Sequence, residues 1–228
     1  MGGQVVRATL ETLDVDEGVA AIREAYPGSQ WRAPKDRPFF SAVRLVGDDR
    51  LGFLDMDQRA TVDSTLPKQD SFIIGAPTQP SLRVAAGRDQ LDVTRPFLYS
   101  LRELTAAWNE EIHLRVTQLD EQTVRDVAAA QYGARPQALR MVGTAPISPQ
   151  LERYWNIVVA YARQVADDEE LFENDLIRHE VLHTLIGAML RVFPHSLSAD
   201  AATHDRAGVL TASLRRAIAY MEEHAGDP

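Results

Sequence analysis

Two hydrophobic periods divide the chain, and their order limits the folds that it can adopt. Between about residues 39 and 118 the sequence consists of short β-rich runs separated by turn-forming residues, whereas apolar residues recur at helical spacing after Leu119. Many short strands at this spacing are typical of a β-sandwich or a small barrel. We therefore predict an α+β fold in which a β-barrel precedes a helical region. The β-rich runs are residues 40–46, 51–56, 59–63, 71–74, 81–85, 90–94, 97–101 and 112–117.

Start and stop signals mark two short helices. Residues 16–26 carry acidic side chains in the first turn and are followed by Pro27, which cannot continue a helix. Asp120 is a suitable N-cap for a helix over residues 120–130. One short helix is therefore expected before the β-rich region and one directly after it.

Two longer helices follow and form an expected antiparallel hairpin. Ser148 can cap the first, with Pro149 at the tolerated first position. The second runs from Asn174 until Pro194 stops it. The acidic residues 167–170 form the expected turn between the two helices.

Large apolar side chains are concentrated on the hairpin. They are too many for a free surface, so we expect burial against the barrel, against another chain, or both. The side chains are Tyr154, Trp155, Val158, Leu182, Ile186, Met189 and Phe193.

The net charge of the chain limits the partners that it can bind. The chain contains 24 Lys and Arg against 33 Asp and Glu, which gives a formal net charge of −9. Affinity for duplex DNA comes mostly from cationic side chains that replace condensed counterions. Basic residues do not cluster beyond pairs such as Arg215 and Arg216. We therefore expect no specific DNA binding by this chain alone.

The absence of cysteine excludes disulfides, thiolate catalysis and cysteine-ligated metal. No apolar run approaches the roughly 20 residues of a membrane span, and the N-terminus lacks the pattern of a secretory signal. We therefore expect a cytoplasmic protein with no membrane partner.

The order of helix, barrel, helical hairpin, linker and final helix resembles that of AraC-type transcriptional regulators. Phe72-Ile-Ile-Gly-Ala-Pro77 is one of the runs that resemble the barrel strands of this family. Residues 214–228 resemble the opening helix of its DNA-binding domain. Further resemblance lies in residues 81–84, 95–101 and 112–119 of the β-rich region and in residues 139–146, 153–155 and 190–195 of the helical region.

The resemblance implies a cupin-like ligand-binding barrel over residues 1–118, a helical dimerisation region over residues 119–195, a linker over residues 196–212 and the opening helix of a truncated DNA-binding domain over residues 213–228. It also implies a small organic effector in the barrel and a homodimer formed through the apolar side chains of the hairpin. Contact with DNA is expected only through a C-terminal helix-turn-helix domain that this chain lacks.

The interior of the expected barrel supplies the candidate ligand site. Phe53 and Phe72 also suit a core, and the faces of Arg44 and Tyr99 depend on the strand register. The barrel region contains a single histidine, so we expect no metal, no cofactor and no catalytic group there. The candidate ligand-binding residues are Trp31, Arg44, Phe53, Phe72, Tyr99 and His113.

One motif indicates a different class of function. His179, Glu180 and His183 match the H-E-x-x-H pattern, in which two histidines bind zinc and the glutamate activates water. The extended form of this motif is not met, since Ile186 and Met189 occupy the positions of its glycine and third histidine. We predict a non-enzymatic protein in which this pair is structural, and we keep a small zinc-dependent hydrolase as the alternative.

Overall fold

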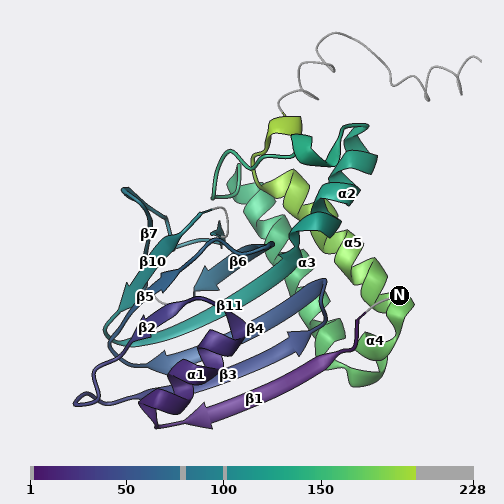
Figure 1. Ribbon diagram of the computed structural model, residues 1–228. Helices are drawn as coiled ribbons and strands as arrows, with labels where there is room; N and C mark the ends of the chain where they lie inside the picture. Colours follow the sequence, from purple (N-terminus) through teal and green to yellow (C-terminus); the bar gives the residue numbers. More distant parts are fainter. Residues whose placement is uncertain (1–2, 78–80, 100–101, 199–228) are drawn as a thin grey trace, which may run out of the picture.

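Two antiparallel β-sheets face each other, and helices cover the outer face of the larger sheet (Figure 1). The computed structural model describes residues 3–77, 81–99 and 102–198. Residues 199–212 of the predicted linker and the predicted final helix over residues 213–228 lie outside the described residues. The observed order of strands followed by helices confirms the predicted α+β class.

The strands pair in antiparallel fashion throughout both sheets of the described chain. Across the larger sheet the order is β1 (Val6–Thr12), β3 (Phe40–Gly47), β4 (Leu51–Arg59), β11 (Glu111–Asp120), β6 (Ser71–Pro77) and β9 (Phe97–Leu98). Across the smaller sheet the order is β2 (Gln30–Arg32), β5 (Val62–Leu66), β10 (Leu104–Trp108), β7 (Arg83–Ala86) and β8 (Asp89–Gln90).

The two sheets do not join into a closed barrel, which corrects the predicted barrel. The strand predicted over residues 90–94 is mostly a turn, because the Asp92 carboxylate accepts hydrogen bonds from the backbone N–H and the hydroxyl of Thr94. Pro96 follows and has no N–H to donate to a neighbouring strand. The architecture is a sandwich of two antiparallel sheets.

The middle of the larger sheet is buried on both faces, and successive side chains of a strand point to opposite sides. On β4, Phe53 belongs to the core shared with the helices. Leu54 and Met56 belong to the core shared with the smaller sheet. The same sheet therefore contributes to two separate hydrophobic cores.

Side-chain caps start the helices at the expected places. Asp120 accepts hydrogen bonds from the backbone N–H groups of Gln122 and Thr123, and Ser148 accepts one from Leu151. Among the described residues, no helix is both long and apolar enough to cross a membrane. The helices are α1 (Val15–Ala25), α2 (Glu121–Tyr132), the 3₁₀ turn η1 (Pro136–Ala138), α3 (Pro149–Asp167), α4 (Glu169–Glu173) and α5 (Asp175–Val192).

The predicted acidic turn over residues 167–170 overlaps with the additional helix α4. Asp168 caps α4 by accepting a hydrogen bond from the backbone N–H of Leu171, and Glu169 and Glu170 lie in the first turn. Negative charge at a helix N-terminus is favourable, so this acidic run forms helix as well as turn.

The apolar side chains of the hairpin serve mainly the core of the chain itself. Of the residues predicted for a dimer interface, Tyr154 is exposed. The others pack among the helices and against the larger sheet, so in this conformation they cannot contact a partner. The buried members are Trp155, Val158, Leu182, Ile186, Met189 and Phe193.

A buried histidine holds the chain after the hairpin. The Nε2–H group of His195 donates to the Leu190 carbonyl over 2.8 Å, and Nδ1 accepts from the backbone N–H of Ser198 over 3.3 Å. Both ring nitrogens are thus satisfied in the neutral form, and a second proton on Nδ1 would face another donor. Burial lowers the pKa of His195, although the hydrogen bond to Leu190 acts in the opposite direction.

This histidine predicts a loss of stability in mild acid. A folded-state pKa below the unfolded value of about 6.5 means that the unfolded chain takes up the proton first. The free energy of unfolding should therefore begin to fall as the pH drops through that value, and continue to fall until the folded-state pKa is passed. Urea denaturation between pH 8 and pH 5 measures this slope.

A His195→Gln variant should show a shallower slope than the wild type over the same pH range. His183→Gln is the comparison variant. The pKa of His183 is also lowered, by partial burial and by the neighbouring His179, but this side chain is more exposed than that of His195. Equal slopes for the wild type and His195→Gln would assign the acid sensitivity to other groups.

Candidate ligand cavity between the two sheets

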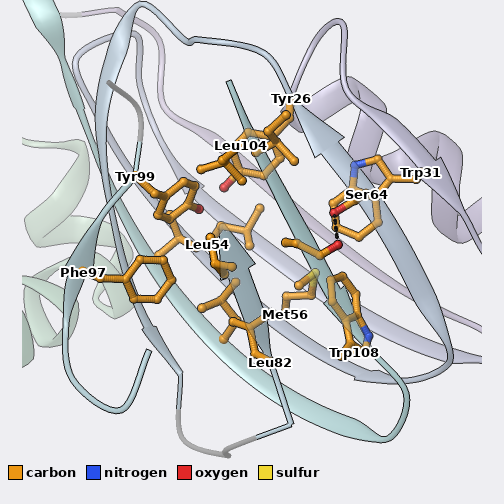
Figure 2. A pocket seen from close by; sticks show the side chains of 15 residues that line it. Tyr26, Trp31, Leu54, Met56, Ser64, Leu82, Phe97, Tyr99, Leu104 and Trp108 are labelled. Carbon is orange, nitrogen blue, oxygen red and sulfur yellow. Dashed lines mark hydrogen bonds between the residues drawn. The ribbon is translucent and has the colours of Figure 1, made fainter. Parts of the chain in front are cut away.

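A cavity of about 40 Å³ lies between the two sheets (Figure 2). The lining is apolar apart from a hydroxyl on Ser64 and the polar atoms of two tyrosines and two tryptophans. No lining residue carries a charge at neutral pH. The side chains that line it are Tyr26, Trp31, Leu54, Met56, Ser64, Leu66, Leu82, Val84, Phe97, Tyr99, Leu104, Ala106, Trp108, Leu114 and Val116.

Two indole rings form one end of the cavity. Trp31 and Trp108 meet edge to face, with ring centroids 5.4 Å apart and an interplanar angle of 70°. Trp31 Nε1 donates to the hydroxyl of Ser29 over 3.1 Å. The Ser64 hydroxyl, which lies beside these rings in Figure 2, donates to the Ala106 carbonyl over 3.0 Å. This end of the cavity therefore offers aromatic surface, and its serine is already satisfied.

Two phenol rings lie at the other end, where Tyr26 and Tyr99 approach each other (Figure 2). The Tyr26 side chain is buried, and its hydroxyl makes no hydrogen bond of ordinary geometry in the protein, although the Tyr99 hydroxyl lies close to it. Burial raises the pKa of Tyr26 to about 12. Burial, together with the neighbouring Tyr26, also raises the pKa of Tyr99 well above its ordinary value. Both phenols are thus neutral at physiological pH, and each can donate a hydrogen bond.

A larger open groove of about 810 Å³ adjoins this end of the cavity. Tyr26 and Leu54 line both spaces, so these two side chains separate the groove from the cavity. The groove, unlike the cavity, is lined by charged groups as well as apolar ones. The charged residues along it are Glu24, Asp48, Asp49, Arg50, Lys68, Asp70 and Asp120.

Of the six residues predicted to bind ligand, Trp31 and Tyr99 line the cavity. Arg44, Phe53 and Phe72 do not, because the strand register turns them to the opposite face of the larger sheet. There the Arg44 guanidinium pairs with the Asp167 carboxylate over 2.7 Å. Phe53 and Phe72 pack in the core beneath the helices.

His113 also lies away from the cavity. It follows Ile112 on β11, and the side chain of Ile112 faces the smaller sheet, so that of His113 points to the other side. The ring contacts the Asp57 carboxylate through Nδ1, and its Nε2 lies 3.5 Å from Glu111. This arrangement is a surface ion-pair cluster.

Sequence reasoning missed most of the lining. Tyr26 belonged to a predicted helix end, and Trp108 lay in a stretch for which no strand was predicted. The alternation of Leu54 and Met56 on β4 was visible in the sequence, but it did not reveal which face was enclosed. Only the pairing of distant strands places these side chains around one cavity.

The H-E-x-x-H motif lies on the outer side of α5. His179, Glu180 and His183 are exposed, and the two imidazole centroids lie 4.2 Å apart. In the part of the chain that the structure describes, no group of three or more His, Cys, Asp or Glu side chains is arranged to hold a metal ion. The described residues therefore bring no third ligand to this pair.

Comparisons with known proteins identify the fold. No protein-family model matches the chain, and no curated protein matches its sequence. The solved structure of the AraC-like transcriptional activator CuxR matches with a TM-score of 0.54 at 13% identity, covering 96% of this chain and 80% of that one. The resemblance to AraC-type regulators is thus confirmed at the level of the fold.

Two further structures overlap with about half of the chain. The cupin domain of Schizosaccharomyces pombe Cnp3 covers 47% of this chain and 77% of its own, with a TM-score of 0.32 and 10% identity. A variant of oxalate decarboxylase from Bacillus subtilis covers 49% and 37%, with a TM-score of 0.28 and 12% identity.

Proposed function

From the fold shared with an AraC-like activator, we propose that this chain is the effector-sensing and dimerisation domain of a cytoplasmic transcriptional regulator. The observation that carries the proposal is the uncharged cavity on one face of a sheet whose other face supports the helical hairpin. An apolar pocket with few polar groups suits reversible binding of a small molecule. In such a regulator, DNA contact belongs to a separate helix-turn-helix domain.

Strands β4 and β11 connect the cavity with the hairpin. Leu54 of β4 and Val116 of β11 line the cavity. Arg163 of α3 donates to the Asp55 carboxylate over 2.6 Å and to the Val116 carbonyl over 2.9 Å. Its guanidinium also lies over the Phe53 ring, 5.2 Å from the centroid. A ligand that displaces either strand would therefore act directly on the position of α3.

The outer side of α3 is the surface that we propose for dimerisation with a second copy. Tyr154, Ile157 and Tyr161 are 36%, 69% and 47% exposed and recur at helical spacing. Exposed apolar groups in such a row are typical of a protein–protein interface. These three residues are the candidate contacts in place of the hairpin residues that were predicted from the sequence and are buried. Tyr154 belongs to both sets.

An Ile157→Asp variant should be monomeric at concentrations where the wild type is dimeric. A charge buried without a partner at the centre of an interface costs about 2 kcal/mol or more, which weakens association at least about 30-fold. Sedimentation velocity over a concentration series measures the change. The control is Leu13→Asp, which alters an equally exposed apolar residue far from α3. A dimer that Ile157→Asp leaves intact would place the interface elsewhere.

Ligand binding is tested by thermal shift with a metabolite library. A compound present at 100 times its Kd should stabilise the wild type by about 2.7 kcal/mol. An Ala106→Leu variant, which narrows the cavity, should lose this stabilisation. Arg44→Ala should retain it, because Arg44 lies on the opposite face of the sheet. Hits that stabilise Ala106→Leu as strongly as the wild type would show that the effector site is not this cavity.

A further inference from the structure

We infer that the cavity binds a compact, uncharged and largely apolar molecule, one end of which carries a hydrogen-bond acceptor that the Tyr26 hydroxyl recognises. The inference rests on the proposed function, since it concerns the ligand of the same cavity. Three features of the cavity support it: the absence of charge, an unpartnered buried hydroxyl and a restricted aromatic space.

The absence of charged side chains excludes ionised ligands from the cavity. None of the fifteen side chains that line the cavity carries a charge, and the hydroxyl of Ser64 is already donated to a carbonyl. A carboxylate or phosphate moved into such surroundings loses its hydration, which costs several kcal/mol even after relaxation of the protein. The charged residues nearby line the groove outside. A ligand in the cavity is therefore neutral.

The Tyr26 hydroxyl supplies the specific contact. The residue is 5% exposed, and its hydroxyl makes no hydrogen bond of ordinary geometry in the protein, although the Tyr99 hydroxyl lies close enough to affect its pKa. Leaving a buried donor unsatisfied is unfavourable, so an acceptor brought by the ligand would recover much of this cost. A carbonyl, ether or hydroxyl oxygen fulfils this requirement, whereas a pure hydrocarbon does not.

The shape of the cavity sets the size and character of the ligand. With about 10–15 Å³ needed for each water, a volume of about 40 Å³ holds about three waters. A single ring with short substituents thus fits only after modest movement of the flexible side chains, such as Met56. The edges and faces of Trp31, Trp108 and Phe97 favour an aromatic ring.

Tyr26 also lies on the access route to the cavity. It shares with Leu54 the boundary between the open groove and the enclosed space. It caps the C-terminus of α1 and precedes Pro27 and Gly28, where Gly28 has a φ of +80° that favours glycine. A ligand entering from the groove would pass this side chain and then accept its hydrogen bond.

The experiment compares three probes of similar shape. Acetophenone is neutral and has an acceptor, α-methylstyrene replaces its oxygen by a CH₂ group, and benzoate is charged. Calorimetric titration and indole fluorescence should show acetophenone binding most tightly to the wild type and benzoate not binding. Tyr26→Phe should weaken acetophenone about 5- to 10-fold, the equivalent of one hydrogen bond, and leave α-methylstyrene unchanged.

Tyr132→Phe is the matched control, because it removes a phenol hydroxyl from α2, outside the cavity lining and outside the proposed dimerisation surface. Equal denaturation midpoints for the wild type and Tyr26→Phe establish that the fold is intact. Benzoate binding as tight as that of acetophenone, or acetophenone binding unaffected by Tyr26→Phe, would overturn the inference.

The two proposals fail in different ways. If library ligands bind and Ala106→Leu abolishes their binding, but none is neutral with an acceptor, the cavity stands and the ligand class is wrong. If no ligand depends on Ala106, the proposed effector site itself fails.

Discussion

Replacing Arg178 by methionine is expected to lower the free energy of unfolding by about 3–5 kcal/mol. The side chains of Arg178 and Asp48 are 3% and 1% exposed and pair over 2.8 Å. Arg178 also donates to the Phe172 carbonyl over 2.6 Å, so it connects α5, α4 and the turn between β3 and β4. The variant would leave the Asp48 carboxylate buried with two backbone donors from the turn and with the Arg50 guanidinium, which lies 4.0 Å away.

Chemical denaturation at neutral pH measures this effect, and a second variant tests its cause. Asp48→Asn combined with Arg178→Met removes both charges, so the double variant should be more stable than Arg178→Met alone. A loss below 1 kcal/mol in the single variant would mean that the pair does not hold the hairpin to the sheet.

The second large effect is expected at Gly47, the last residue of β3. A methyl group added there would lie 2.4 Å from the Leu51 carbonyl oxygen and 2.7 Å from the Gly52 Cα. Both are backbone atoms, which cannot rotate away, so the hairpin must shift. We expect Gly47→Ala to lose about 3 kcal/mol of stability or more.

Gly52 provides a matched control, because it pairs with Gly47 across the same hairpin. A Cβ at Gly52 meets only the Gln118 Cβ, at an ordinary distance of 3.7 Å. Gly52→Ala should therefore be neutral or stabilise by up to about 1 kcal/mol, since alanine loses less backbone entropy on folding. Equal denaturation midpoints for the two variants would contradict the close approach at Gly47.

The candidate site was only partly predictable from the sequence. Trp31 and Tyr99 were predicted to bind ligand, and both line the cavity. Phe53 satisfied the same criterion of an aromatic residue on a strand, yet it faces the helices. A one-residue difference in position reverses the face of a strand side chain, and the sequence carries no separate signal for the face when both faces of a sheet are buried.

The apolar side chains of the hairpin were predicted to form a dimer interface for a related reason. The α5 helix has a broad apolar side that is buried, opposite the exposed side with His179 and His183. Leu182, Ile186 and Met189 indicated burial correctly but could not indicate the partner. The sheet, α3 and the smaller helices supply that partner within the chain. The less apolar surface of α3, with Ile157 and Tyr161, was left exposed.

The sequence by itself determined the features that depend on neighbouring residues. The caps at Asp120 and Ser148 were predicted and observed, because a capping side chain bonds to backbone N–H groups two or three residues away. The order of most strands and helices followed from hydrophobic period in the same way, whereas β1, β2 and β10 lie in stretches for which no strand was predicted.

Tertiary structure decided what depends on residues far apart. Strand β10 has two central alanines, which favour strands weakly, and it forms because β5 and β7 pair with its two edges. That pairing brings Trp108 beside Trp31, and the packing of α1 brings Tyr26 toward Tyr99. The cavity is a property of these long-range contacts, so no local pattern could encode which side chains enclose it.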